Sequence, residues 1–112
     1  MVIADYIIEH VAEETGITKK LIKSKYRHQE IVDAKQTVVF ALTYLGFTQK
    51  FIGNQLKYRD HSTVNHLINK RFFNSHENRL RATQAVKSYL DMALVENARL
   101  RQDIEAKISE EG

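Results

Sequence analysis

The chain has 112 residues, enough for one domain with a modest hydrophobic core and too few for a second core of similar size. It contains no cysteine, which excludes disulfide bonds and thiolate metal sites. No apolar run approaches the ~20 residues that span a bilayer, and the N-terminus has no basic segment ahead of an apolar one, so we expect a soluble cytoplasmic protein without a membrane partner.

Charge is segregated along the chain although the net charge is only +3. Residues 18–87 hold fourteen Lys or Arg against four Asp or Glu, a balance of +10, whereas residues 1–17 carry −4 and residues 88–112 carry −3. Concentrated positive charge is typical of proteins that bind polyanions, because phosphates attract it and binding releases counterions. A solvated lysine-rich surface explains the same count equally well, so charge alone does not decide the function.

Hydrophobic periodicity predicts an all-α fold, and the absence of proline suits long helices. Apolar residues at i, i+3 and i+4 predict a first helix over about residues 2–14, ended by Gly16, and a short second helix over residues 18–22. A third helix is predicted from about residue 29 to 45, ended by Gly46. It is apolar around much of its circumference, so we expect it to be central in the core.

Residues 48–72 follow a helix-turn-helix pattern. Thr48 is predicted to cap a helix over residues 49–56, and three residues of turn separate that helix from a second one. Apolar residues at helical spacing give the second helix a buried stripe, and these are Val64, Leu67, Ile68 and Phe72. Any helical hairpin shows this periodicity, so the pattern alone is of moderate specificity.

The opposite face of this second helix is rich in hydrogen-bonding side chains. At ~100° per residue, the polar residues that fall away from the apolar stripe are Ser62, Asn65, His66 and Asn69. Three more polar residues lead into the helix, namely Arg59, Asp60 and His61. Asp60 or Ser62 can cap the free N–H groups of the first turn.

The run Arg59-Asp60-His61-Ser62-Thr63-Val64, with His66 two residues further on, resembles the signature of the C-terminal DNA-binding domain of the bacterial replication initiator DnaA. Upstream, Ser24-Lys25-Tyr26-Arg27, Ile31-Val32 and Lys35-Gln36 resemble the basic loop and following helix of that domain, and Ile52-Gly53 fits the first helix of its helix-turn-helix. The resemblance covers roughly residues 2–94. It implies an all-α helix-turn-helix domain of the DnaA C-terminal, Trp-repressor-like type, here free-standing and with an extended C-terminal helix.

The same resemblance implies sequence-specific binding to double-stranded DNA and no small-molecule substrate. Its implied major-groove residues are Arg59, Asp60, His61, Ser62, Thr63, Asn65 and His66. Arg27 takes the place of the family's minor-groove arginine, where a guanidinium favours the narrow groove of A·T-rich DNA. Phosphate contacts are implied for Ser24, Lys25, Lys35, Gln36, Lys57 and Tyr58.

Some positions depart from the family pattern. Lys57-Tyr58 replaces the usual glycine pair before Arg-Asp-His, which alters the turn; Asp33 lies in a stretch that is usually more basic, and Thr43 lies where a lysine is usual. No Gly-x-x-x-x-Gly-Lys-Ser/Thr loop for a triphosphate is present, so we expect neither an ATPase nor any other enzyme. His61 and His66 are five residues apart and do not form the i, i+4 pair of a helical zinc site, so no metal or other cofactor is expected.

A long helix is predicted from about residue 76 to 108, with residues 1–94 as the DNA-binding domain and residues 95–112 as a helical extension. Read as heptads, one core position holds Leu90, Asn97 and Ile104, and the other holds Val86, Ala93 and Leu100. Glu96 can then face Arg101 of a second copy, but Lys107 interrupts the pattern. We favour a helix that folds back on the domain over a homodimer through residues 86–108.

The expected function is therefore sequence-specific DNA binding at origin-type boxes or operator sites, in replication initiation or in transcription regulation, by a nucleoid-associated protein of a phage or mobile element. The initial Met and the extension past the expected domain end favour a complete small protein. The alternative is a helical protein–protein interaction adaptor whose basic residues give only nonspecific affinity for nucleic acids.

Overall fold

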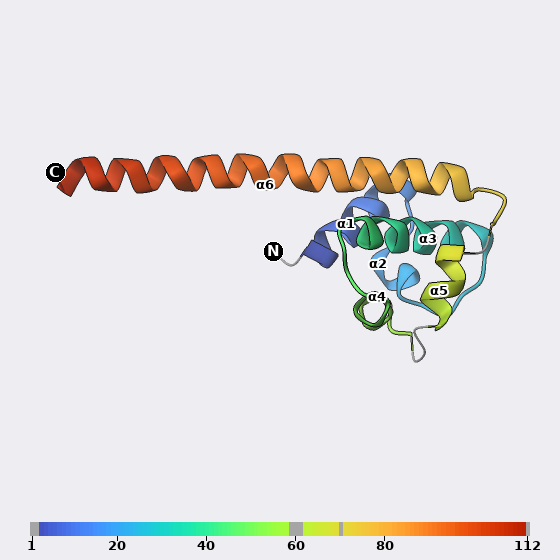
Figure 1. The fold of residues 1–112 in the computed structure, drawn as a ribbon. Coiled ribbons are helices and arrows are strands. Elements are labelled where there is room, and N and C mark those ends of the chain that lie inside the picture. Colours follow the sequence, from blue (N-terminus) through green and yellow to red (C-terminus); the bar gives the residue numbers. More distant parts are fainter. Residues whose placement is uncertain (1–2, 59–61, 70, 112) are drawn as a thin grey trace.

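A computed structural model describes residues 3–58, 62–69 and 71–111 of the chain (Figure 1). These described residues form helices and no strand, which confirms the all-α prediction. The helices are α1 (Ile3–Thr15), α2 (Lys19–Ile22), α3 (Gln29–Tyr44), α4 (Gln49–Gln55), α5 (Ser62–Asn69) and α6 (Ser75–Glu111). Among these described residues, none of the helices has both the length and the hydropathy of a membrane span.

Local side-chain chemistry sets the ends of the shorter helices. The Thr18 hydroxyl accepts a hydrogen bond from the Leu21 N–H at 3.2 Å and caps α2, and the Thr48 hydroxyl accepts one from the Phe51 N–H at 3.1 Å and caps α4. Gly16 and Gly46 follow α1 and α3 with φ angles of 73° and 89°, a left-handed conformation that costs glycine little. The predicted cap at Thr48 and the predicted stops at Gly16 and Gly46 are therefore confirmed, whereas the cap of α5 by Asp60 or Ser62 stays a prediction, and Asp60 lies outside the described residues.

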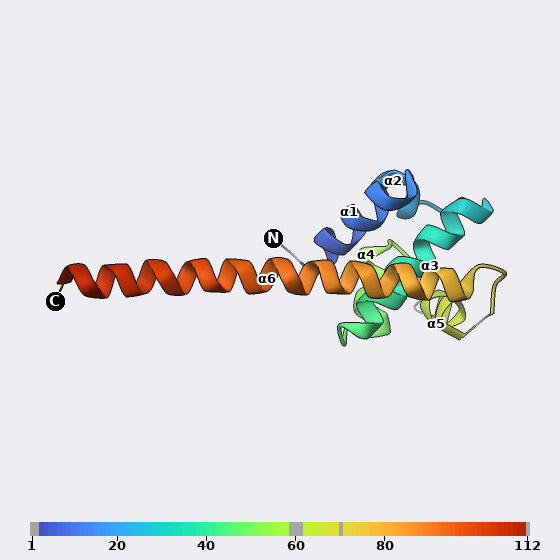
Figure 2. The same cartoon turned by 90° about the horizontal axis from the view of Figure 1, so that it is seen from above.

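Helix α3 is the centre of the domain, as its apolar circumference predicts. Figures 1 and 2 show α6 lying across one side of α3 while α4 and α5 lie on the other. Every helix contributes fully buried side chains to the core, and α6 does so only through its first half. The largest fully buried apolar side chains are Ile7, Ile8, Ile22, Phe40, Leu42, Ile52 and Leu56. Each such side chain contributes roughly 1.5–3 kcal/mol of transfer free energy when it leaves water.

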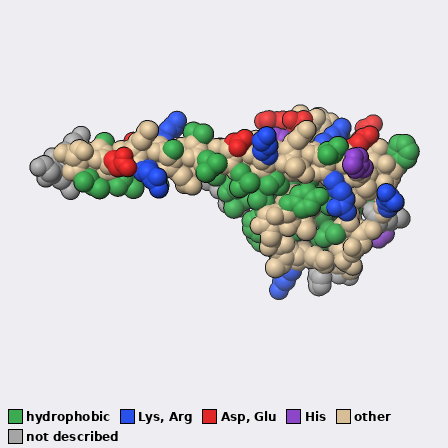
Figure 3. All heavy atoms as spheres, turned by 45° about the horizontal axis from the view of Figure 1, so that its top comes forward, with side chains coloured by type: hydrophobic (Ala, Val, Ile, Leu, Met, Phe, Trp, Pro, Cys, Tyr) green, Lys and Arg blue, Asp and Glu red, His purple; other side chains and the backbone are tan. Residues whose placement is uncertain are grey.

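The long helix α6 has one packed half and one exposed half. Its first half reaches the domain through the fully buried Ala82 and Ala85, and the Tyr6 and Ser88 hydroxyls are hydrogen-bonded at 2.8 Å. Every described side chain from Leu94 to Ser109 is exposed, and the helix projects away from the domain (Figures 1 and 2). Apolar and charged side chains both appear along this projecting half (Figure 3). The interpretation that the tail folds back on the domain is therefore wrong.

A buried polar network joins α3, α5 and the start of α6. The Gln36 side-chain NH₂ donates to the Leu67 carbonyl at the end of α5 (3.0 Å), and the Asn78 NH₂ donates both to the Gln36 side-chain oxygen (2.8 Å) and to the Asp33 carboxylate (3.1 Å). The Asp33 carboxylate also accepts from the Asn74 NH₂ at 2.9 Å. An unpaired buried polar group costs free energy, so these hydrogen bonds hold α5 in position relative to α3 and α6.

Candidate nucleic-acid interface

A groove of about 930 Å³ lies between the basic loop before α3 and the beginning of α5. It brings together nine of the residues that the sequence predicts to contact DNA, namely Ser24, Lys25, Arg27, Lys35, Lys57, Tyr58, Ser62, Thr63 and His66. Positions far apart in the sequence therefore form one surface. Arg59, Asp60 and His61, predicted to read bases, lie outside the described residues.

The charge of this groove is of one sign among the described residues that line it. They include five basic residues, Lys23, Lys25, Arg27, Lys35 and Lys57, and no Asp or Glu. Lys25, Arg27 and Lys57 are exposed, so their charges are available to a ligand. Phosphate groups are the natural counterions of such a surface.

Helix α5 presents its polar residues outward, as its spacing predicts. Ser62, Thr63, Asn65 and His66 are exposed, whereas Val64 is fully buried and Leu67 is nearly so. The two apolar residues hold α5 on the core, so the position of the polar face depends on the fold of the whole domain.

Asn65 and His66 are both oriented by neighbouring side chains. The Asn65 side-chain oxygen accepts hydrogen bonds from the side-chain NH₂ groups of Gln49 (3.3 Å) and Asn69 (2.6 Å), which ties α4 to α5. The His66 imidazole meets the Phe72 ring edge-on, with 6.0 Å between ring centroids. Asn65 does not line the groove, whereas His66 does.

Lys35 holds the basic loop in place. Its ammonium group donates hydrogen bonds to the Ser24 and Tyr26 carbonyls, the second at 3.1 Å, and lies 5.9 Å from the centre of the Tyr58 ring. Burial lowers the pKa of Lys35 below 10.5, and the charge of Arg27 lowers it further. Because Lys35 is only 5% exposed, the expectation that it contacts phosphates is corrected: it positions the loop.

Two other predicted phosphate contacts also change. Gln36 is fully buried in the network with Leu67 and Asn78, so it is not accessible to DNA. The Ser24 hydroxyl donates its proton to the Leu21 carbonyl at 2.6 Å and accepts from the Tyr26 N–H at 3.3 Å, so it is engaged within the loop. Polar residues of this loop and of α3 thus form hydrogen bonds inside the protein and stabilise the groove. The sequence pattern alone does not distinguish such internal bonds from contacts with a ligand.

The turn between α4 and α5 explains why glycine is usual there in the family that the sequence resembles. Lys57 has a φ of 60°, a left-handed conformation that costs a residue with a Cβ roughly 1–2 kcal/mol. The Tyr58 N–H donates to the Gly53 carbonyl at 2.9 Å and the Lys57 N–H donates to the Asn54 carbonyl at 3.2 Å, which together form a Schellman cap of α4. Burial raises the pKa of Tyr58 from 10.0 to about 12.

Sequence reasoning missed several groove residues. Lys23, Gln29 and Val32 also line it. Lys23 directly precedes the basic loop, so the density of positive charge in that segment was an available signal for it. Val32 is part of the Ile31-Val32 pair in the family resemblance and packs partly buried against the core, so its place in the groove wall was not expected. Gln29 is exposed, its side-chain NH₂ donates to the Asp33 carboxylate at 3.0 Å, and no motif marks it.

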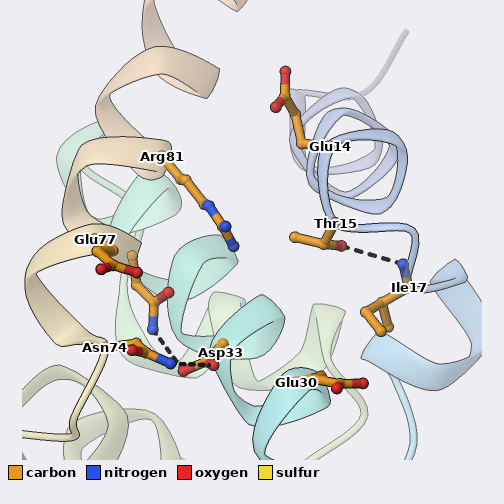
Figure 4. Close-up of a pocket in the computed structure, with 9 residues that line it drawn as sticks. Glu14, Thr15, Ile17, Glu30, Asp33, Asn74, Glu77 and Arg81 are labelled. Carbon is orange, nitrogen blue, oxygen red and sulfur yellow. Dashed lines mark hydrogen bonds between the residues drawn. The ribbon is translucent and has the colours of Figure 1, made fainter.

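A second hollow, of about 270 Å³, has the opposite charge (Figure 4). Its acidic lining residues are Glu14, Glu30, Asp33 and Glu77, and Arg81 is its one basic lining residue among those described. Figure 4 shows the Asp33 carboxylate bonded to Asn74 at its edge. Within the described part of the chain, no cluster of His, Cys, Asp and Glu is arranged to hold a metal ion. This hollow repels phosphates and does not belong to the basic groove.

Comparisons with known proteins agree with this geometry. The profile of the family described as "Bacterial dnaA protein helix-turn-helix" matches residues 4–70. The chromosomal replication initiator protein DnaA of Ureaplasma parvum serovar 3 is 42% identical over 67 residues, 59% of this chain, and that of Campylobacter curvus is 40% identical over 65 residues, 57% of this chain. In each case the match spans 15% of the relative's length. No solved structure matches the chain significantly.

The residues matched by the family profile include α3, α4, α5 and the basic loop. The chain belongs to the bacterial DnaA helix-turn-helix family.

Proposed function

We propose that this chain binds double-stranded DNA through the groove between the basic loop and α5, and reads its sequence there. One observation supports the proposal most directly. The exposed polar face of α5 and five basic residues lie on one surface, and the described residues that line it include no Asp or Glu. A helix fits the major groove of B-DNA, which is about 12 Å wide. The basic loop lies on the far side of the groove from α5, where it would meet the phosphate backbone and the adjacent minor groove.

The chemistry of α5 suits base edges. Hydroxyl groups, as on Ser62 and Thr63, donate to or accept from bases, and the Thr63 methyl group can pack on a thymine methyl. His66 lines the groove next to them. Arg59, Asp60 and His61 directly precede this turn in the sequence, so base reading by these three is proposed from their place in the chain.

Arg27, Lys25 and Lys57 complete the proposed interface. Arg27 is exposed on the loop and is the side chain proposed for the minor groove of A·T-rich DNA. Lys25 and Lys57 are exposed, line the groove and would contact phosphates, which fix the orientation of the protein without reading sequence. Tyr58, which is partly buried, also lines the groove, with the Lys35 ammonium over its ring.

The relatives are named chromosomal replication initiator proteins, so we propose that the DNA sites are of the origin type and that the chain acts in replication initiation. The match covers 15% of each relative, and this sequence has no phosphate-binding loop for ATP, so we infer a binding module and not an ATPase. A transcription operator would use the same interface, and no described residue favours that role.

The test is selection of bound duplexes from a random pool, followed by equilibrium binding of the selected and a scrambled duplex across a salt series. We expect a consensus sequence and a salt-dependent nonspecific component on both duplexes. A protein-interaction adaptor with basic residues would bind both duplexes alike and yield no consensus, which would exclude specific recognition.

Two variants then test which side chains recognise the base pairs. His61→Ala should weaken binding to the selected duplex by ~1–3 kcal/mol and leave the scrambled one nearly unchanged. His76→Ala, at an exposed histidine at the start of α6, is the matched control and should change neither. Equal losses on both duplexes for His61→Ala would exclude base reading by His61.

Arg27→Ala should reduce the preference for A·T base pairs flanking the consensus, because the guanidinium is proposed for the minor groove. Arg99→Ala, on the exposed half of α6, is its control and should leave the preference intact. An identical loss on A·T-flanked and G·C-flanked sites would place Arg27 on the phosphates instead.

A further inference from the structure

The projecting half of α6 carries an apolar stripe, interrupted by Asn97, that no part of the described chain covers. Leu90, Leu100, Ile104 and Ile108 are 49%, 59%, 51% and 64% exposed, and the partly exposed Ala93 and the exposed Asn97 lie on the same face by helical spacing. Exposed apolar side chains at regular spacing on a helix mark a surface that packs against another helix. Leu94 flanks this stripe, whereas Val95 lies on the opposite side of the helix.

The stripe begins where contact with the domain ends. Val86 and Tyr89 still pack against the core, and Tyr89 meets Tyr6 with 5.5 Å between ring centroids. From Leu90 to Ile108 the helix is ~27 Å long at 1.5 Å per residue, about three heptads. An isolated helix of this length is only marginally stable in water, so the projecting half needs a partner or the support of the packed half.

We propose that a second copy of this chain covers the stripe, and that the two α6 helices form a parallel coiled coil through residues 90–108. In the heptad frame, Leu90, Asn97 and Ile104 take the a positions and Ala93 and Leu100 take the d positions. An asparagine at a single a position specifies a two-stranded parallel pair, since the two amides bond across the interface. The next d position, three residues after Ile104, holds the charged Lys107. Ile108, four residues after Ile104, makes the contact with the second helix in its place.

The flanking charges favour the parallel orientation. In a parallel pair, Glu96 at g faces Arg101 at e of the second copy, and this opposite-charge contact forms on both sides of the interface. In an antiparallel pair, g positions face g positions, which brings Glu96 and Asp103 of one helix towards the same acidic residues of the other. Like charges at that distance are destabilising, so charge complementarity identifies the second copy as a parallel partner.

A parallel pair would place two DNA-binding domains at the same end of one stalk. This consequence rests on the proposed function. The second domain would then bind DNA as an intramolecular event, which raises the affinity for two neighbouring sites over one site by a factor of about 10² or more. Paired sites would be bound more tightly only if their spacing matches the separation of the two domains.

The mass of the full chain in solution, measured without DNA by sedimentation equilibrium over a range of concentrations, tests the pairing directly. We expect twice the monomer mass at high concentration. Leu100→Asp should return the chain to the monomer mass, while Ala98→Asp, outside the core positions, should not. Far-UV circular dichroism checks that both variants remain helical. A monomer mass for the unchanged chain at every concentration would overturn the proposal, whatever other protein the stripe binds.

Cysteine cross-linking tests the orientation, because the natural chain has no cysteine. Ile104→Cys should form a disulfide-linked dimer under mild oxidation, since parallel a positions face each other, and Gln102→Cys, on the outer face, should not. A dimer mass without a cross-link at Ile104→Cys, or equal cross-linking at both positions, would overturn the parallel pair. A dimer that binds no DNA would refute the proposed function alone, and a monomer that binds DNA would refute the pairing alone.

Discussion

The two sides of the groove are held in place in different ways. Helix α5 is fixed by buried apolar side chains and by the hydrogen bond from Gln36 to the Leu67 carbonyl, and this network continues into α6 through Asn78. The basic loop is fixed locally, by the ammonium of Lys35 bonded to the Ser24 and Tyr26 carbonyls. We therefore expect the proposed base-reading side to depend on the stability of the whole domain, and the proposed phosphate-binding side to open locally without unfolding it.

The largest effect should come from the α5 side. Gln36→Ala removes the donor to the Leu67 carbonyl and the acceptor of the Asn78 NH₂, leaving buried groups unpaired. We expect the free energy of unfolding, measured by urea denaturation, to fall by about 3 kcal/mol. DNA binding should fall with it, because α5 loses its support.

Gln84→Ala, at an exposed glutamine of α6, is the control and should change stability by less than about 0.5 kcal/mol. If Gln36→Ala proved as mild as the control, the polar network would contribute little and α5 would be held by its apolar residues alone.

A smaller and more local effect is expected from the loop side. Lys35→Met keeps most of the side-chain volume and removes two hydrogen bonds from a charged donor, so we expect a loss of about 1–2 kcal/mol. Hydrogen exchange should increase in residues 24–28 and remain unchanged in α5. Lys25→Met removes an exposed charge from the same loop and should leave both measurements unaltered. Faster exchange in α5 after Lys35→Met would show that the two sides are not independent.

Lys57 lies in the turn between α4 and α5, and replacing it should stabilise the domain. Lys57→Gly relieves the left-handed backbone and should raise the free energy of unfolding by about 0.5–1 kcal/mol. It also removes an exposed charge at the groove, so affinity for all duplexes should fall and the salt slope should decrease by about 1.

Lys50→Gly is the matched control, because Lys50 is an exposed lysine within α4. The same change there should lower stability, since glycine weakens a helix. A loss of stability in both variants would mean that the conformation of Lys57 carries no strain.

The helices and their ends could be predicted from the sequence because they depend on local signals. Thr18 and Thr48 are caps, Gly16 and Gly46 are stops, and the apolar spacing of α3 marks the centre of the core. The exposed polar face of α5 follows from the same spacing.

The internal partners of polar residues could not be predicted in the same way. Lys35 and Gln36 are residue types that often contact phosphates. Only the three-dimensional positions of the loop and of α6 show that Lys35 donates to a loop carbonyl and that Gln36 accepts from Asn78. Asp33, which departs from the family pattern, accepts hydrogen bonds from Asn74 and Asn78, both beyond the matched residues 4–70. The direction of the helix after Tyr89 is likewise a property of long-range packing, which a heptad pattern does not report.

The smallest expected effect concerns Tyr58, which lies between the two sides with its ring beneath Lys35. Burial raises the pKa of its phenol to about 12, so the folded protein binds this proton more tightly than the unfolded chain, whose tyrosines have a pKa near 10. The contribution to stability is fully present below pH 10 and is lost as the pH rises from 10 towards 12. An absorbance titration of the phenolate should therefore show a step near pH 12 that Tyr58→Phe removes.

Tyr26→Phe, at an exposed tyrosine of the loop, is the control and should leave that step in place. If the step removed by Tyr58→Phe instead had its midpoint near pH 10, water would reach the Tyr58 phenol, and the junction between α5 and the basic loop would be open.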